Sequence, residues 1–147
     1  MKICLLAPAD SYHTEKIVRF LVRHGHEVMI CTFHNANYPS IDVRYFPPKL
    51  TSLRKINYYL NAWSVRRIIH EIKPDILHAH YASSYGVVGY LTGFHPLVIS
   101  VWGSDIYDRP MNPIAKYLIK KALNKADAVL STSCLLYTSP SPRDRQK

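Results

Sequence analysis

Two histidines separated by one residue, His78 and His80, are the first sign of chemistry in the sequence. They close the run Asp75–Tyr81, which predicts a β-strand, and side chains two residues apart point to the same face of a strand. In one interpretation His80 faces a substrate and exchanges a hydrogen bond or a proton with a sugar or phosphate oxygen. A metal pair and ordinary packing are the alternatives. A metal site needs further ligands, and neither an HxxxH spacing nor an Asp/His cluster supplies them.

A second polar group follows the apolar run Leu97–Trp102 and consists of Gly103, Ser104 and Asp105. A carboxylate and a hydroxyl can bind sugar hydroxyls, and the face of Trp102 can pack against sugar C–H groups. This combination favours a sugar site. In the alternative interpretation, Ser104 or Asp105 only caps the next helix or turn.

A third polar group, with Asp10, Ser11 and His13, follows the short apolar run Lys2–Ala7. Dinucleotide-binding loops and P-loops need glycines here, because their backbone must approach a phosphate closely. The chain has no glycine before Gly25. The sequence therefore argues against a nicotinamide-dependent enzyme and a P-loop NTPase.

Alternating strands and helices must position these three groups. Short runs of β-forming residues predict strands, and apolar residues three and four apart predict helices. The expected strands are 2–7, 27–33, 43–46, 75–81, 97–102 and 128–132, and the expected helices are 14–24, 50–72, 85–91 and 112–125. This order predicts an α/β fold with a doubly wound parallel sheet. Ligands bind beyond the carboxyl ends of such strands, so the three polar groups should meet at one rim. We expect His80, Asp105 and His13 to line one open cleft there, with His78 deeper on the strand.

The expected helix at 50–72 combines an apolar and a basic pattern. Its apolar positions are Leu53, Ile56, Leu60 and Trp63, which are three or four residues apart. We expect these residues to lie on one face of the helix.

The segment Lys49–Lys73 is strongly basic in a chain of net charge +9. On a helix, Lys55, Tyr59, Ala62 and Arg66 share one stripe. Such a stripe suits an anionic membrane surface, at about 1 kcal/mol per cation. The alternative is a solvated face of a core helix. Nucleic acid is not an expected partner, because no groove-reading motif accompanies the charge.

The composition is that of a folded domain, with 48% hydrophobic and 20% charged residues. No apolar run reaches the roughly 18 residues that a membrane span needs, and the apolar start is too short for a signal peptide. Cys4 and Cys31 fall in expected strands without metal spacing, which is typical of reduced core residues. We expect a cytoplasmic protein, peripheral on the inner face of the membrane if the basic segment binds lipid.

Residues 134–147 differ from the rest of the chain. The run CLLYTSPSPRD, which begins at Cys134, resembles a translated sequencing adapter. We therefore interpret residues 1–133 as one truncated domain and residues 134–147 as a non-native tail.

The ends of the expected strands and the segments that follow them resemble the N-terminal domain of family-4 GT-B glycosyltransferases. The run KPDILHAHYASSYGVVGYL is followed by a strand into WGSDIY and a helix into NKADAVLSTS. The family has a strand ending in His-x-His, then one ending in His-Gly-Ser-Asp, then Ala-Asp before a strand ending in Ser. Arg23–Thr32 resembles its Gly-His-Glu-Val second strand, and His13 its histidine after the first loop. Two departures stand out: Ala9-Asp10-Ser11 replaces paired glycines, and Trp102 replaces a histidine.

The resemblance covers nearly all of residues 1–133 and implies a Rossmann-like N-terminal half of a GT-B fold. It implies that the intact enzyme moves a sugar from a nucleotide-diphosphate sugar to a glycan or lipid-linked acceptor, with retention and without a metal or other cofactor. This half would bind the acceptor and would be inactive without its donor-binding C-terminal domain. His80 would be catalytic. The acceptor-binding residues would be His13, Asp10, Ser11, His78, Tyr81, Trp102, Gly103, Ser104 and Asp105.

Two functions of other classes remain open on the sequence. One is a stand-alone module that binds a sugar or nucleotide without catalysis. The other is a metal-dependent hydrolase that uses His78 and His80.

Overall fold

The computed structural model describes residues 1–36, 38–47, 58–103 and 113–131. Its strands are β1 (Lys2–Leu6), β2 (Glu27–Thr32), β3 (Asp42–Tyr45), β4 (Ile76–His80), β5 (Leu97–Val101) and β6 (Ala128–Ser131). Its helices are α1 (Tyr12–Arg23), α3 (Ala62–Ile72), the π-helical turn η1 (Tyr81–Gly86), α4 (Val87–Thr92) and α5 (Pro113–Lys125). The elements agree with the expected ones to within a few residues at most ends.

The described strands form one parallel sheet in the order β3-β2-β1-β4-β5-β6. The chain moves outward from β1 through β2 to β3, and then returns to the other side of β1 with β4. The order therefore reverses between β1 and β4. The α/β fold with a doubly wound parallel sheet is confirmed, and the point of reversal is where such folds bind ligands.

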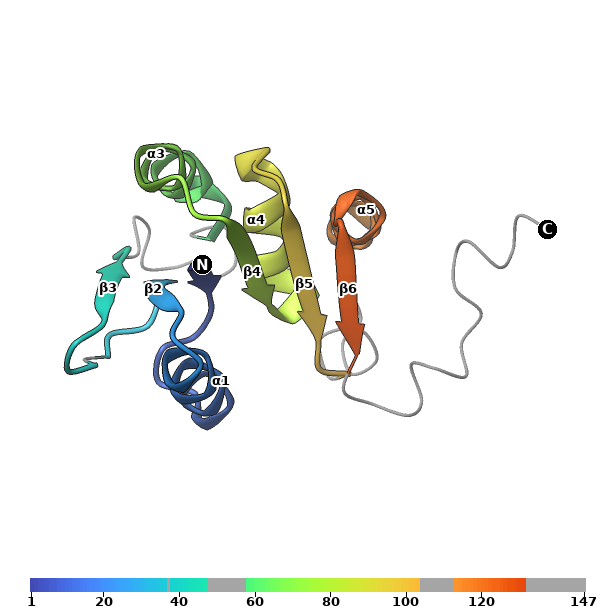
Figure 1. The fold of residues 1–147 in the computed structure, drawn as a ribbon. Helices are drawn as coiled ribbons and strands as arrows, with labels where there is room; N and C mark the ends of the chain where they lie inside the picture. The colour runs from blue at the N-terminus through green and yellow to red at the C-terminus, as the bar shows by residue number, and fades with distance from the viewer. Residues whose placement is uncertain (37, 48–57, 104–112, 132–147) are drawn as a thin grey trace.

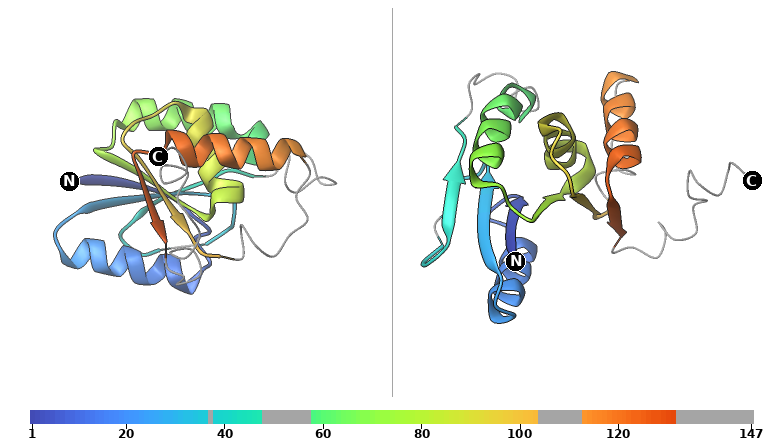
Figure 2. Two further views of the ribbon diagram at one scale, coloured as in Figure 1. Left: turned by 90° about the vertical axis from the view of Figure 1, so that its right-hand side faces the viewer. Right: turned by 45° about the horizontal axis from the view of Figure 1, so that its top comes forward.

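The helices lie on both faces of the sheet. Helix α1 covers one face, and α3, α4 and α5 lie side by side on the other (Figures 1 and 2). This division is expected when every crossover is right-handed, because the chain winds in opposite directions from β1. The sheet thus has an α1 face and a three-helix face.

The three-helix face holds the larger core. Side chains from β4 and β5, among them Leu77, Ala79 and Ile99, are fully buried there against Val65 and Ile69 of α3. The α1 face holds a smaller core, formed by Ile3, Leu5, Ala7, Ala9, Val18, Val28 and Ile30.

Helix α3 corrects one expectation from the sequence. The structure buries Ala62, Val65 and Ile69 of this helix, whereas Leu60 is 42% exposed and Trp63 is 74% exposed. At the two described positions the apolar pattern that predicted the helix therefore does not form its buried face; Leu53 and Ile56 lie outside the described residues. The sequence of this helix has two sets of apolar residues. The set with the smaller side chains, Ala62, Val65 and Ile69, is the one that packs inward.

The connection from β4 to β5 begins with an irregular turn that the sequence did not predict. Tyr81 has a positive φ of 69°, and the π-helical turn η1 precedes α4. A Cβ atom on Gly86 would lie 3.2 Å from the Tyr81 carbonyl oxygen and 3.3 Å from Ile99 Cγ2. A larger residue at this position would have to displace these neighbours by a few tenths of an ångström, so the turn favours glycine. It sits directly beyond the carboxyl end of β4.

Candidate functional site

An aromatic cluster lies at the carboxyl ends of β1, β4 and β5, around the ring of Trp102. The His13 ring lies 4.7 Å from the Trp102 ring, between centroids, and the His80 ring lies 5.9 Å away. The Tyr81 ring is 6.0 Å from Trp102. Residues from three separate strand exits therefore meet at the point where the strand order reverses, as the sequence analysis expected for His13, His80 and Trp102.

The two histidines of β4 share the α1 face of the sheet, as their spacing predicts. Their ring centroids are 4.8 Å apart. The His78 Nε2 atom lies 2.8 Å from the Ser100 hydroxyl oxygen of β5. The structure thus anchors the His78 ring to the neighbouring strand.

His80 is 1% exposed, and neither of its ring nitrogens has a hydrogen-bond partner within the described ranges. From the sequence we expected His80 to line an open cleft, with His78 deeper on the strand. That expectation is wrong: His78 is half-buried and His80 is buried. Trp102 and His13 lie close to the His80 ring, because β5 and α1 place them at the same rim.

Burial keeps both histidines neutral. It lowers the pKa of His78 to about 4. Burial also lowers the pKa of His80 to about 3, with smaller contributions from the charges of His78 and His13. At neutral pH each ring therefore has one nitrogen that donates a hydrogen bond and one that accepts.

The backbone beyond β4 is held in an uncommon conformation at this site. A positive φ at a bulky residue such as Tyr81 costs free energy, and such residues cluster at functional sites. π-Helical turns are also frequent at functional sites. Both features adjoin His80, which supports a functional role for the rim of β4.

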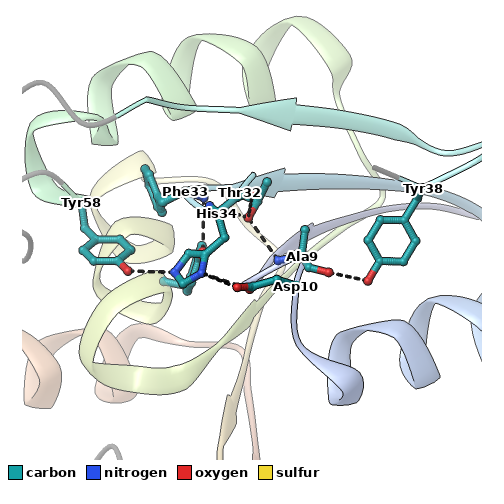
Figure 3. A network of polar contacts seen from close by, with 8 residues as sticks. Ala9, Asp10, Thr32, Phe33, His34, Tyr38 and Tyr58 are labelled. Carbon is teal, nitrogen blue, oxygen red and sulfur yellow. Dashed lines mark hydrogen bonds and ion pairs between the residues drawn. The ribbon is translucent and has the colours of Figure 1, made fainter. Parts of the chain in front are cut away.

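Asp10 and Ser11 lie at the carboxyl end of β1 with His13, but Asp10 has a different partner. Its carboxylate lies 3.0 Å from His34 Nδ1, and His34 Nε2 lies 3.3 Å from the Tyr58 hydroxyl (Figure 3). Because a carboxylate can only accept, His34 Nδ1 donates to Asp10 and a neutral ring accepts from Tyr58. His34 was not among the site residues predicted from the sequence, although it lies just after the carboxyl end of β2.

The third exit is described only in part. Gly103 has a φ of 94°, a conformation that favours glycine. Ser104 and Asp105 lie outside the described residues, so their predicted convergence with His13 and His80 stays a prediction.

Among the described residues, no group of three or more His, Cys, Asp or Glu side chains could hold a metal ion. His78 bonds to Ser100, and the His80 ring faces Trp102 instead of an acid. The geometry of these residues thus gives the hydrolase alternative no support.

A family model described as "Glycosyl transferase 4-like" matches residues 2–133. The chain belongs to this family. A curated glycosyltransferase of Methanocaldococcus jannaschii, itself uncharacterized, is 26% identical to this family member over 127 residues. The alignment covers 84% of the chain and 36% of that relative, so the chain spans about a third of the relative's length.

A solved structure of sucrose-phosphate synthase from Thermosynechococcus elongatus has a similar fold. Its TM-score is 0.66 at 14% sequence identity, and the alignment covers 93% of this glycosyltransferase 4-like chain and 79% of the other. The parallel sheet is thus the Rossmann-like half of a GT-B fold.

The basic segment of this glycosyltransferase 4-like chain differs from its expected form. Ala62 is 7% exposed, and the half-buried Tyr59 hydroxyl lies 3.4 Å from the Ser83 carbonyl oxygen. The predicted stripe is wrong at these two positions, because both side chains pack inward. Lys55 lies outside the described residues, and Trp63 is the exposed aromatic residue of α3. No helix in the described part of the chain is both long and apolar enough to span a membrane.

Proposed function

We propose that residues 1–133 are the acceptor-side half of a retaining GT-B glycosyltransferase. The intact enzyme moves a sugar from a nucleotide-diphosphate sugar to a hydroxyl of a glycan or lipid-linked acceptor. The reacting sugars lie at the rim where β1, β4 and β5 end. The family assignment and the GT-B fold support this proposal.

The observation that carries the proposal is the buried ring of His80, with two nitrogens that lack a partner in the described structure. Leaving a buried polar group without a hydrogen bond costs about 1–3 kcal/mol. A sugar hydroxyl both donates and accepts, so it would satisfy either nitrogen. The neighbouring face of Trp102 would pack against the C–H groups of the same sugar.

The neutral state of His80 narrows its role. An imidazole with a pKa of about 3 has no extra proton to give at neutral pH. We therefore assign it a hydrogen bond to a sugar hydroxyl that strengthens as the reaction proceeds, in place of general acid catalysis. His13 and Tyr81 would border the same sugar through their contacts with Trp102.

A second domain would complete the enzyme. Nucleotide-sugar contacts in this proposal come from a C-terminal domain, and no metal or other cofactor takes part. The 147-residue chain should therefore release no nucleoside diphosphate from any nucleotide sugar. In a longer chain that carries the donor domain, His80→Ala should lower kcat by on the order of a hundredfold, far more than it alters folding.

Tryptophan fluorescence tests sugar binding at this site. The chain has two tryptophans, and Trp63 is 74% exposed on α3. A Trp63→Phe chain makes Trp102 the reporter, and a Trp102→Phe chain is the matched control. Titration with a panel of hexoses, N-acetylhexosamines and nucleotide sugars should change Trp102 emission, and His80→Ala should weaken the response. Equal responses from the two single-tryptophan chains, or no effect of His80→Ala, would contradict the proposal.

A further inference from the structure

A groove of about 680 Å³ lies beside α1. Its other wall is the connection from β2 to β3, of which residues 33–36 and 38–41 are described. Because β2 and β3 are parallel, this connection must return from the carboxyl end of the sheet to its amino end. Such crossovers are usually helices. Here the described part is irregular, and it leaves a channel along α1.

The groove has a mixed lining. Val18, Val22 and Ile41 are among its apolar residues, and Glu15 and Arg19 of α1 line it as well. Asp10 and Ser11 lie at the amino end of α1, in the loop that leads to His13, and Arg23 lies at the carboxyl end of this helix. From Ser11 to Arg23 a helix rises about 18 Å, at 1.5 Å per residue. A single sugar cannot occupy both ends.

Hydrogen bonds hold the mouth of the groove in place (Figure 3). The Tyr38 hydroxyl donates to the Ala9 carbonyl oxygen at 2.5 Å. The Ala9 amide donates to Thr32 Oγ1 at 3.1 Å, and His34 bonds to Asp10. These contacts hold the β2–β3 connection against the loop after β1. They therefore fix the position of one wall of the groove.

Charge is distributed unevenly along the groove. Asp10 bonds to His34 at the mouth, and the groove-lining Glu15 and Arg19 form an ion pair with each other further along α1. Arg23 lines the far end and has no acidic partner in the described part of the chain. A planar guanidinium with free donors suits a carboxylate or phosphate group.

We propose that the groove binds an acidic acceptor glycan. Hydroxyls near the reacting end of this glycan would bind Asp10 and Ser11, and a carboxylate or phosphate further along it would bind Arg23. The inference rests on the proposed function for its reacting end only. It defines the acceptor as longer than one sugar and negatively charged.

Calorimetric titration of the whole chain tests this proposal with three probes. They are a tetrasaccharide of alternating glucuronate and N-acetylglucosamine, the neutral tetrasaccharide of N-acetylglucosamine, and a glucose phosphate. Arg23→Gln removes the cation, Arg23→Lys retains the charge without the planar fork, and Lys16→Gln is the matched control. Lys16 is exposed on α1, contacts the Tyr12 ring and does not line the groove.

The glucuronate probe should bind about tenfold more weakly to Arg23→Gln than to the unaltered chain. Arg23→Lys should retain part of the affinity, and Lys16→Gln should match the unaltered chain. The neutral probe should not distinguish the variants. An Arg23-dependent response to the glucose phosphate as well would extend the site to phosphorylated acceptors.

Equal binding of the glucuronate probe to Arg23→Gln and the unaltered chain would overturn the inference, as would an equal loss in Lys16→Gln. The circular dichroism spectrum of each variant must match the unaltered chain, which is expected because Arg23 is exposed. Failure of the proposed function would look different: Arg23-dependent binding would persist while no sugar changed Trp102 emission.

Discussion

Strand β4 contributes to both faces of the sheet, and the two faces have opposite characters. Leu77 and Ala79 are fully buried in the apolar core beneath α3, α4 and α5. His78 and His80 alternate with them and face the α1 side, where one ring bonds to Ser100 and the other has unpartnered nitrogens within the described structure. A single strand thus carries structural residues on one face and candidate chemistry on the other.

The contrast between the two faces indicates that stability and candidate function depend on different residues of the same sheet. Apolar burial on the three-helix face is the main source of folding free energy, because it removes large side chains from water. His78 and His80 on the α1 face oppose folding when protons are available, because their environment disfavours the charged ring. Such conflicts between local composition and burial are expected at functional sites.

The largest effect of a single substitution should come from the three-helix face. Leu77→Ala should lower the free energy of unfolding by about 2–5 kcal/mol, because it leaves a cavity in a closed core. Urea denaturation of the variant and the unaltered chain measures this change. A loss below about 1 kcal/mol would show that the two faces do not differ as described.

A loss of stability that builds up over several pH units should come from acid on the α1 face. An unfolded histidine has a pKa of about 6.5, whereas the folded values are about 4 for His78 and about 3 for His80. Between pH 6.5 and pH 4 the unfolded chain therefore binds more protons, and the free energy of unfolding falls as the pH falls. The slope should reach about 1.4 kcal/mol per pH unit for each of the two histidines.

Replacing a buried histidine tests the source of this slope. His80→Gln should make the loss of stability in acid shallower, and His70→Gln should not, since His70 is exposed on α3. Thermal unfolding at several pH values gives the comparison. If His80→Gln leaves the pH dependence of stability unchanged, residues other than His80 must be the groups that titrate.

The smallest effect should come from the edge of the sheet. Leu130 of β6 is 49% exposed, and its pairing with Ser100 places it on the α1 side. Leu130→Gln should change the free energy of unfolding by less than about 0.5 kcal/mol. A loss comparable to that of Leu77→Ala in the same urea assay would show that Leu130 is packed in solution.

The sequence was sufficient for the fold and for part of the site. Alternating strands and helices predicted the sheet, and the two-residue spacing of His78 and His80 predicted their common face. These features depend on local periodicity. The meeting of His13 with Trp102 followed from the general rule that the carboxyl ends of parallel strands share a rim.

Features that depend on tertiary packing could not be predicted in this way. The burial of His80 depends on how Trp102 and α1 lie around it. The buried face of α3 depends on which of two apolar patterns fits α4, and Ala62 and Val65 fit better than Trp63. The contact between Asp10 and His34 joins two loops. No local pattern in the sequence shows that these loops lie close together.

The central claim is that His80 is a buried, neutral imidazole that binds a sugar hydroxyl. Nitrogen NMR of the histidine rings in the ¹⁵N-labelled chain tests it most directly, with His80→Gln identifying the His80 signals. The account predicts a neutral ring from pH 7 to about pH 4, and a shift of one ring nitrogen when a sugar that changes Trp102 emission is added. Titration of His80 near pH 6.5, or ring signals unmoved by that sugar, would contradict it.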